Sequence, residues 1–244
     1  MSSPLAIVLL LLPVALLACG DSDSPFPVGE ALAAAQSSLL TVEDFPEGWT
    51  KEDIRPILSS PLFDAEDTPP ECELFLENAD LDHVLAADQA TFFGMGEQSV
   101  ESGAAVFESE EAAAAVVERF RKYPSRCEET LRAAFRDTLE SIEDLSSGLP
   151  EIRLADVEVT ELALADYGNE SAGVRLTMTA ESDERSVTTW MDVIVTRADH
   201  VVGGFHYTST DAEPDQSLED RLLPHLEARV RAADASLRET PRGN

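Results

Sequence analysis

The strongest constraint on the fold is an alternation of apolar and polar residues between positions 172 and 208. Residues 172–180 and 187–196 each place apolar side chains at every second position, which is typical of strands with one buried face. A turn at Ala198-Asp199 leads into a third strand, residues 200–208. The three segments together predict an antiparallel meander.

Other segments show the same kinds of pattern. Two further strands are expected within residues 88–107, and one at about 152–164, where imperfect alternation indicates a bulge. Apolar residues at helical spacing predict helices over residues 29–40, 70–79, 109–123, 125–142 and 217–237. Pro124 is expected to end the third helix, and the capping-box pattern Ser125-x-x-Glu128 to start the fourth.

This order of elements predicts the fold class. Helices stand early and late in the chain around a mostly antiparallel sheet, without an internal repeat or an evident linker. We therefore expect a single α+β domain over residues 29–240, with helices packed on one face of the sheet.

The N-terminus carries a different signal. Residues 5–18 form an uncharged apolar run that is shorter than the about 20 residues needed to span a bilayer, so residues 1–18 are interpreted as a signal peptide. The sequence Leu16-Leu17-Ala18-Cys19 resembles the lipobox of bacterial lipoproteins, which implies cleavage before Cys19 and lipid on its thiol. Residues 1–4 lack Lys and Arg and Leu17 is large, so ordinary secretion is the alternative.

Residues 19–28 are expected to be the lipidated cysteine and a polar tether, because they are rich in Gly, Ser, Asp and Pro. A diacylglyceryl group supplies two acyl chains, which suffice for stable anchoring. The expected location is the extracytoplasmic face of the cell membrane, with the membrane contacted through the lipid anchor.

Lipidation of Cys19 would leave Cys72 and Cys127 as the remaining cysteines. Disulfides form and persist outside the cytoplasm, so we expect these two to pair. Closing this loop of about 55 residues would stabilise the fold by about 4 kcal/mol in the chain-entropy model. Two buried free thiols are the alternative.

Composition and motifs limit the possible functions. The chain has 48 acidic and 17 basic residues, a formal net charge of −31 that disfavours binding to nucleic acid. No CxxC, HExxH, calcium-loop, GxSxG, GxGxxG or P-loop pattern occurs at usable spacing, and the histidines are scattered. We therefore expect no catalytic, metal or cofactor site, and read His83, His200, His206 and His225 as surface or structural residues.

One group of aromatic residues is a candidate ligand groove. Trp190 lies on one predicted strand, with Phe205, His206 and Tyr207 on the next. If Trp190 sits on a sheet face away from the helices, these side chains could line a groove. The alternative, which we favour, is that they pack the core.

Three stretches together resemble the family of extracellular sensor domains related to that of the mycobacterial receptor kinase PknH, and similar actinobacterial lipoproteins. These are LLTVEDFPEGWT at 39–50, the Cys72 and Cys127 pair, and WMDVIVTRADHVVGGFHY at 190–207. The resemblance covers roughly residues 38–237 and implies a compact α/β fold with disulfides and a ligand cleft. The kinase sensor has two cysteine pairs where this chain has one, and no ligand residue can be carried over.

The expected function is a membrane-anchored, extracytoplasmic ligand-binding or sensor-like module without catalytic activity. Its ligand would be an unidentified small molecule or protein. One alternative is an envelope hydrolase whose residues converge only in the fold. Another is a structural or carrier lipoprotein.

Overall fold

The structure is a computed structural model that describes residues 25–52, 72, 83–94, 96–145, 153–164, 170–182 and 185–239. The strands in these ranges are β1 (Thr50–Glu52), β2 (Val84–Phe93), β3 (Gln98–Phe107), β4 (Arg153–Glu161), β5 (Ser171–Glu181), β6 (Ser186–Ala198) and β7 (Val201–Thr210). The helices are α1 (Val28–Ser38), the short 3-10 helix η1 (Val42–Asp44), α2 (Glu110–Leu145) and α3 (Gln216–Glu239).

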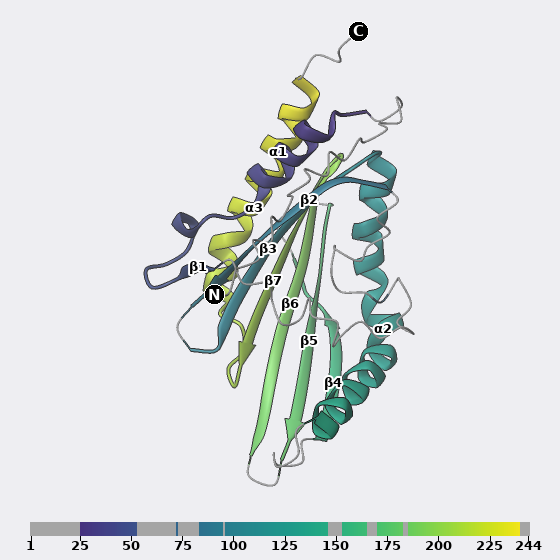
Figure 1. Ribbon diagram of the computed structural model, residues 1–244, viewed down its shortest axis with the longest axis vertical. Coiled ribbons are helices and arrows are strands. Elements are labelled where there is room, and N and C mark those ends of the chain that lie inside the picture. The colour runs from purple at the N-terminus through teal and green to yellow at the C-terminus, as the bar shows by residue number, and fades with distance from the viewer. Residues whose placement is uncertain are drawn as a thin grey trace, which may run out of the picture.

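The strands form one antiparallel sheet in the order β1-β2-β3-β7-β6-β5-β4 (Figure 1). β5, β6 and β7 pair in succession, so the predicted meander is confirmed. The β2–β3 hairpin joins this meander through β3 and β7, and β4 pairs with β5 at the opposite edge. The expected α+β class with a mostly antiparallel sheet is therefore confirmed.

Helices cover both faces of the sheet. α1 and α3 pack on one face, mainly over β2, β3, β7 and β6, and together enclose the first of two hydrophobic cores. α2 packs on the other face, mainly over β4 and β5, and encloses the second core. Figure 1 shows α2 on the opposite side of the molecule from α1 and α3. The expectation that all helices pack on one face is wrong.

The central strands explain this difference. β6 is buried without interruption from residue 191 to 196, and β7 from 201 to 207. Ile194 and Phe205 belong to the core under α3, whereas Val193 and Val202 belong to the core under α2. Strands with apolar side chains on both faces need a cover on each face, because one helical layer would leave the other face in water.

The contact between α3 and the sheet depends on a glycine of β7. A Cβ added at Gly203 would lie 2.5 Å from Cγ2 of Val230 and 3.2 Å from Cδ1 of Leu226. A side chain at this position would therefore push α3 away from β7. The apolar stripe predicted for this helix is confirmed, since all its members are buried: Leu218, Leu222, Leu226, Val230, Ala233 and Leu237.

Packed structure begins earlier than the expected tether allows. Phe26 is only 5% exposed, and its ring lies edge-on to that of His200 with 5.0 Å between the centroids. Cys19 and the signal region lie outside the described residues, as does the helix expected at 70–79 apart from Cys72. Among the described helices, none is long and apolar enough to cross a membrane.

Candidate functional site

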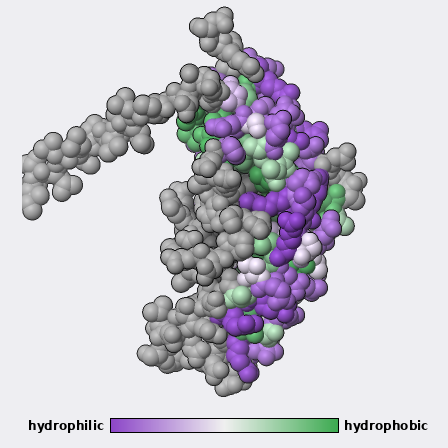
Figure 2. All heavy atoms as spheres, turned by 90° about the vertical axis from the view of Figure 1, so that its right-hand side faces the viewer, coloured by the Kyte–Doolittle hydropathy of each residue, from purple (hydrophilic) through white to green (hydrophobic). Residues whose placement is uncertain are grey.

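A cavity of about 330 Å³ runs along one side of α2. Its described wall residues all come from this helix and recur at intervals of three or four, so they form one stripe. They are Ala115, Glu118, Arg119, Lys122, Tyr123, Arg126 and Cys127. Figure 2 shows the side of the molecule that carries α2, where hydrophilic side chains predominate outside the grey atoms. The volume lies within the range of about 300–1,000 Å³ typical of small-molecule sites.

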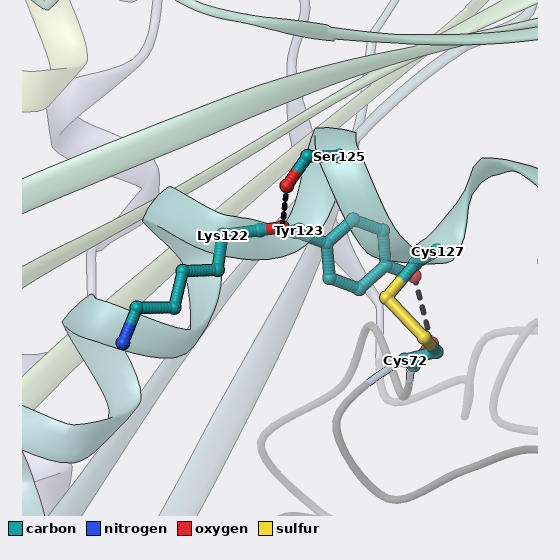
Figure 3. Close-up of a disulfide and its surroundings, with 5 residues drawn as sticks. All are labelled: Cys72, Lys122, Tyr123, Ser125 and Cys127. Atoms are coloured by element: carbon teal, nitrogen blue, oxygen red, sulfur yellow. Dashed lines mark hydrogen bonds between the residues drawn. A yellow bond between two sulfur atoms is a disulfide. The ribbon is translucent and has the colours of Figure 1, made fainter.

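A disulfide ties a distant part of the chain to this wall (Figure 3). Cys72 is bonded to Cys127, as the sequence predicted, and their Cα atoms are 5.3 Å apart. The hydroxyl of Tyr123 donates a hydrogen bond to the backbone carbonyl of Cys72 over 2.7 Å. Residue 72 is thus held to α2 by one covalent bond and one hydrogen bond.

Tyr123 is a neutral hydrogen-bond donor in this arrangement. Its side chain is buried, and burial raises the pKa of its hydroxyl far above the ordinary value, with the charge of Arg119 opposing the rise. The ring also stacks on that of Phe120, with 6.1 Å between the centroids. The hydroxyl therefore keeps its proton at any physiological pH and keeps its bond to Cys72.

α2 continues through Pro124, so the predicted boundary between two helices is wrong. Proline cannot donate to the carbonyl four residues earlier, here that of Phe120, and α2 is visibly bent (Figure 1). The Ser125 hydroxyl satisfies a neighbouring carbonyl by donating to Lys122 over 3.0 Å (Figure 3). Buried side chains on both sides of the proline, Tyr123 and Cys127, hold the two halves against the same core.

The cavity wall carries three cations, Arg119, Lys122 and Arg126. Arg119 and Arg126 are seven positions apart, or about 10 Å along the helix axis. Within the described residues, neither Lys122 nor Arg126 has an ion-pair partner. Glu118, the acidic member of the wall, forms an ion pair with Arg121. The wall is therefore locally positive on a strongly acidic chain.

A second group of ionisable side chains is buried between α3 and the sheet. Arg175 of β5 and Asp192 of β6 face each other in register, and the guanidinium forms an ion pair with the carboxylate. Glu219 of α3 is 3% exposed and lies beside Asp192. Burial, and next the hydrogen bond and charge of Asp192, raise the pKa of Glu219 to about 9. Glu219 is therefore protonated at neutral pH, while Arg175 balances Asp192.

This carboxyl pair is positioned for stability. Asp192 is completely buried and Glu219 nearly so, and both lie in the interface between α3 and the sheet. A general acid or base must reach the atom it protonates within hydrogen-bond distance. Because the described residues enclose both carboxyl groups, we read the cluster as a structural contact between α3 and the sheet.

The structure separates the four residues of the expected groove. Phe205 and Tyr207 are fully buried in the core under α1 and α3, as in the alternative reading. Trp190 is half-buried on the same sheet face, two residues before Asp192. His206 points to the opposite face, where burial lowers its pKa to about 4. These residues therefore do not line one groove.

The remaining histidines are far apart along the chain; His83 and His225 are exposed, and His200 is mostly buried. His83, His200 and His225 each lie beside a single carboxylate, at 3.5, 3.8 and 3.6 Å. Among the described residues, no three or more His, Cys, Asp or Glu side chains come together in a way that could hold a metal ion.

The cationic wall was not predicted from the sequence, because the helices over residues 109–142 were predicted from their apolar residues alone. The spacing of Arg119, Lys122 and Arg126 was visible as a stripe beside Cys127. The chain has two lysines, Lys51 and Lys122. The presence of one of them beside the apolar stripe that contains Cys127 was the sequence signal for this wall.

Comparison with known proteins gives little further information. No protein-family model and no curated protein matches the chain. Among solved structures, it is similar to the extracellular domain of PknH from Mycobacterium tuberculosis, at 12% sequence identity and a TM-score of 0.43. The match covers 86% of this chain and 97% of that domain. The chain thus has a weak structural resemblance to this domain, from which nothing about its function follows.

Proposed function

We propose that this chain is a lipid-anchored, extracytoplasmic module that binds a small ligand in the α2 cavity and catalyses no reaction. The observation that carries the proposal is the cavity of about 330 Å³ whose wall ends at the Cys72–Cys127 disulfide. A pocket of this size accommodates a small molecule, and a covalent tie beside it keeps the wall in place before the ligand arrives.

The disulfide also supports the proposed location. Disulfides persist in oxidising compartments outside the cytoplasm and are rare inside it. The Leu16–Cys19 lipobox pattern gives an independent reason to place the domain outside the membrane, held by lipid on Cys19.

The chemistry of the described wall favours recognition over catalysis. Tyr123 is buried with its hydroxyl bonded to the Cys72 carbonyl, and Glu118 is paired with Arg121. The guanidinium groups of Arg119 and Arg126 offer hydrogen-bond donors and no acceptor. These groups are suited to holding and orienting a ligand.

The binding proposal is tested by filling the cavity. We expect native mass spectrometry of the full chain, purified from the envelope in detergent, to detect a co-purifying small molecule. Ala115→Trp, in the wall, should remove that molecule. Ala133→Trp, exposed on α2 outside the wall, is the matched control and should retain it. An empty wild-type protein, or equal retention by both variants, would contradict the proposal.

The anchor is tested separately. Inhibition of the lipoprotein signal peptidase should leave the unprocessed chain in the membrane, and the mature N-terminus should otherwise carry an acyl mass on Cys19. Cys19→Ser should carry no acyl mass, because the thiol that accepts the lipid is absent. Unchanged processing with no acyl mass would show ordinary secretion instead.

A further inference from the structure

We propose that the ligand of the α2 cavity is a small molecule with a phosphate or comparable oxyanion group, recognised by Lys122 and Arg126. This inference rests on the proposed function and specifies its ligand class. The proposal depends on one observation: two cations border the same cavity, and neither has an acidic partner among the described residues.

Lys122 and Arg126 combine a place in the cavity wall with the lack of an ion pair among the described residues. Acidic residues outnumber basic ones, 48 to 17, so a surface cation usually has a carboxylate within reach. Seven other basic residues form ion pairs: Arg121, Arg132, Arg175, Arg197, Arg229, Arg231 and Arg238. Among the described residues, Lys51, Arg136, Arg153, Arg185 and Arg221 form none, but they do not border the cavity. Lys122 and Arg126 lack such a pair among the described residues. Their charges are therefore available to a ligand.

Their spacing on the helix and their donor groups suit an anion. Lys122 and Arg126 are four residues apart on α2, so their side chains lie on the same side of the helix, one turn from each other. Figure 3 shows the Lys122 side chain extending along the helix away from the disulfide. An ammonium offers three donors and a guanidinium a planar fork, a combination that suits phosphate.

The charge of the whole chain favours a small anion over a membrane surface. An extended anionic bilayer would meet the field of the entire domain, with its net charge of −31. A small anion inside the cavity lies close to the local cations, while salt screens charges more than about 8 Å away. The oxyanion is therefore assigned to a free small molecule, and lipid headgroups become one arm of the test.

Binding is measured by calorimetric titration of the full chain in neutral detergent with inorganic phosphate and phenyl phosphate, and with phenol as the uncharged probe. Wild type should bind phenyl phosphate more tightly than phenol, and less tightly as salt is added. Lys122→Gln/Arg126→Gln should weaken phenyl phosphate binding about ten-fold or more, because two charge-assisted contacts are lost. Gln keeps the helix propensity of this exposed stripe.

Lys51→Gln/Arg136→Gln is the matched control. It removes the same two charges from exposed positions outside the cavity wall, and one of them is also on α2. Its affinity should stay within about two-fold of wild type, since distant surface charges contribute little. An equal loss in both double variants would overturn the inference, because the effect would then come from net charge alone.

The two lysines allow a test within one molecule. Bound phenyl phosphate should slow the acylation of Lys122 by an amine-reactive ester, while Lys51 on exposed β1 reacts at an unchanged rate. Peptide mass spectrometry gives both rates from one sample. Equal rates at Lys122 with and without the probe would contradict its proposed contact with the anion.

The remaining outcomes separate this inference from the proposed function. Equal affinity for phenol and phenyl phosphate would overturn the oxyanion and leave the cavity as a site. Failure of both phosphate probes to bind would overturn the inference as well. Binding only to phosphatidylglycerol vesicles, and not to phosphatidylcholine vesicles or free probes, would reassign the oxyanion to a lipid headgroup. The proposed function itself stands or falls with the co-purifying molecule and the Ala115→Trp variant.

Discussion

Arg175 donates from Nε and Nη2 to the two carboxylate oxygens of Asp192, over 2.7 and 2.6 Å. The two residues are register partners on β5 and β6, and Asp192 is completely buried. α3 covers the pair and adds the protonated Glu219. An ion pair in this position balances a buried charge, so removing one partner leaves the other without compensation.

Arg175→Met should therefore destabilise the domain by about 3–5 kcal/mol, because Asp192 stays buried without its cation. Urea unfolding followed by circular dichroism measures this change. Arg231→Met is the control, since it breaks the exposed ion pair with Glu227 on α3 and should cost less than about 1 kcal/mol. Replacing both partners, as in Arg175→Met/Asp192→Leu, should cost less than Arg175→Met alone. Similar losses of unfolding free energy for Arg175→Met and Arg231→Met would show that the buried pair contributes no more to stability than the exposed pair.

Glu219 should make stability depend on pH. Because its pKa is raised from 4.5 to about 9 in the folded state, the folded chain binds more protons than the unfolded chain between these values. The stability that Glu219 contributes is complete below the unfolded value and is lost as pH rises through the folded one. Glu219→Gln keeps the shape and does not titrate. The unfolding free energy of wild type, relative to Glu219→Gln, should fall by about 2 kcal/mol or more from about pH 5 to about pH 9.

Glu129→Gln, exposed on α2, is the control for this experiment. Any pH dependence that this exposed variant shares with Glu219→Gln does not come from burial of the carboxyl group. Using differences removes the contributions of other groups, such as His206, whose lowered pKa of about 4 acts in the opposite direction at acidic pH. A flat difference for Glu219→Gln would mean that Glu219 is ionised in the folded chain.

Periodicity predicted the strands but not their partners across the sheet. The alternation of β5 and β6 located both strands, yet the pairing of Arg175 with Asp192 depends on the register set by the turn between them. A shift of one residue would send one side chain to the opposite face. The side of the sheet on which each helix packs is equally non-local, so α2 was wrongly expected beside α3.

The candidate site was predictable in part. Compartment chemistry and an even number of remaining cysteines predicted the Cys72–Cys127 bond. The cavity beside it depends on which side of α2 stays clear of the core, and Pro124 had been expected to end that helix. Local rules penalise a proline inside a helix, but burial of Tyr123 and Cys127 on its two sides offsets that cost.

The close approach of α3 to β7 predicts a sharp difference between two glycines. Gly203→Ala should destabilise the domain by about 1–3 kcal/mol, since the new methyl group overlaps Val230. Gly103→Ala on neighbouring β3 is the control, because an added Cβ there meets no atom within 4 Å. It should be neutral or stabilise by up to about 1 kcal/mol through the unfolded state. Chemical denaturation compares them, and equal effects would show that α3 does not depend on the missing side chain.

The tie between Cys72 and α2 predicts a coupling between the disulfide and Tyr123. Cys72→Ser/Cys127→Ser should cost about 4 kcal/mol, because the cross-link closes a loop with a sequence separation of 55. Tyr123→Phe should cost about 1 kcal/mol in the oxidised protein, where it leaves the Cys72 carbonyl without its donor.

In the cysteine-free background the same Tyr123→Phe change should cost measurably less, because residue 72 is no longer held against α2 and its carbonyl can turn to water. Unfolding free energies of the four proteins form a double-mutant cycle, and a coupling of about 0.5 kcal/mol or more is expected. Perfect additivity would mean that the hydrogen bond holds residue 72 in place without the disulfide, and that the two ties act independently on the cavity wall.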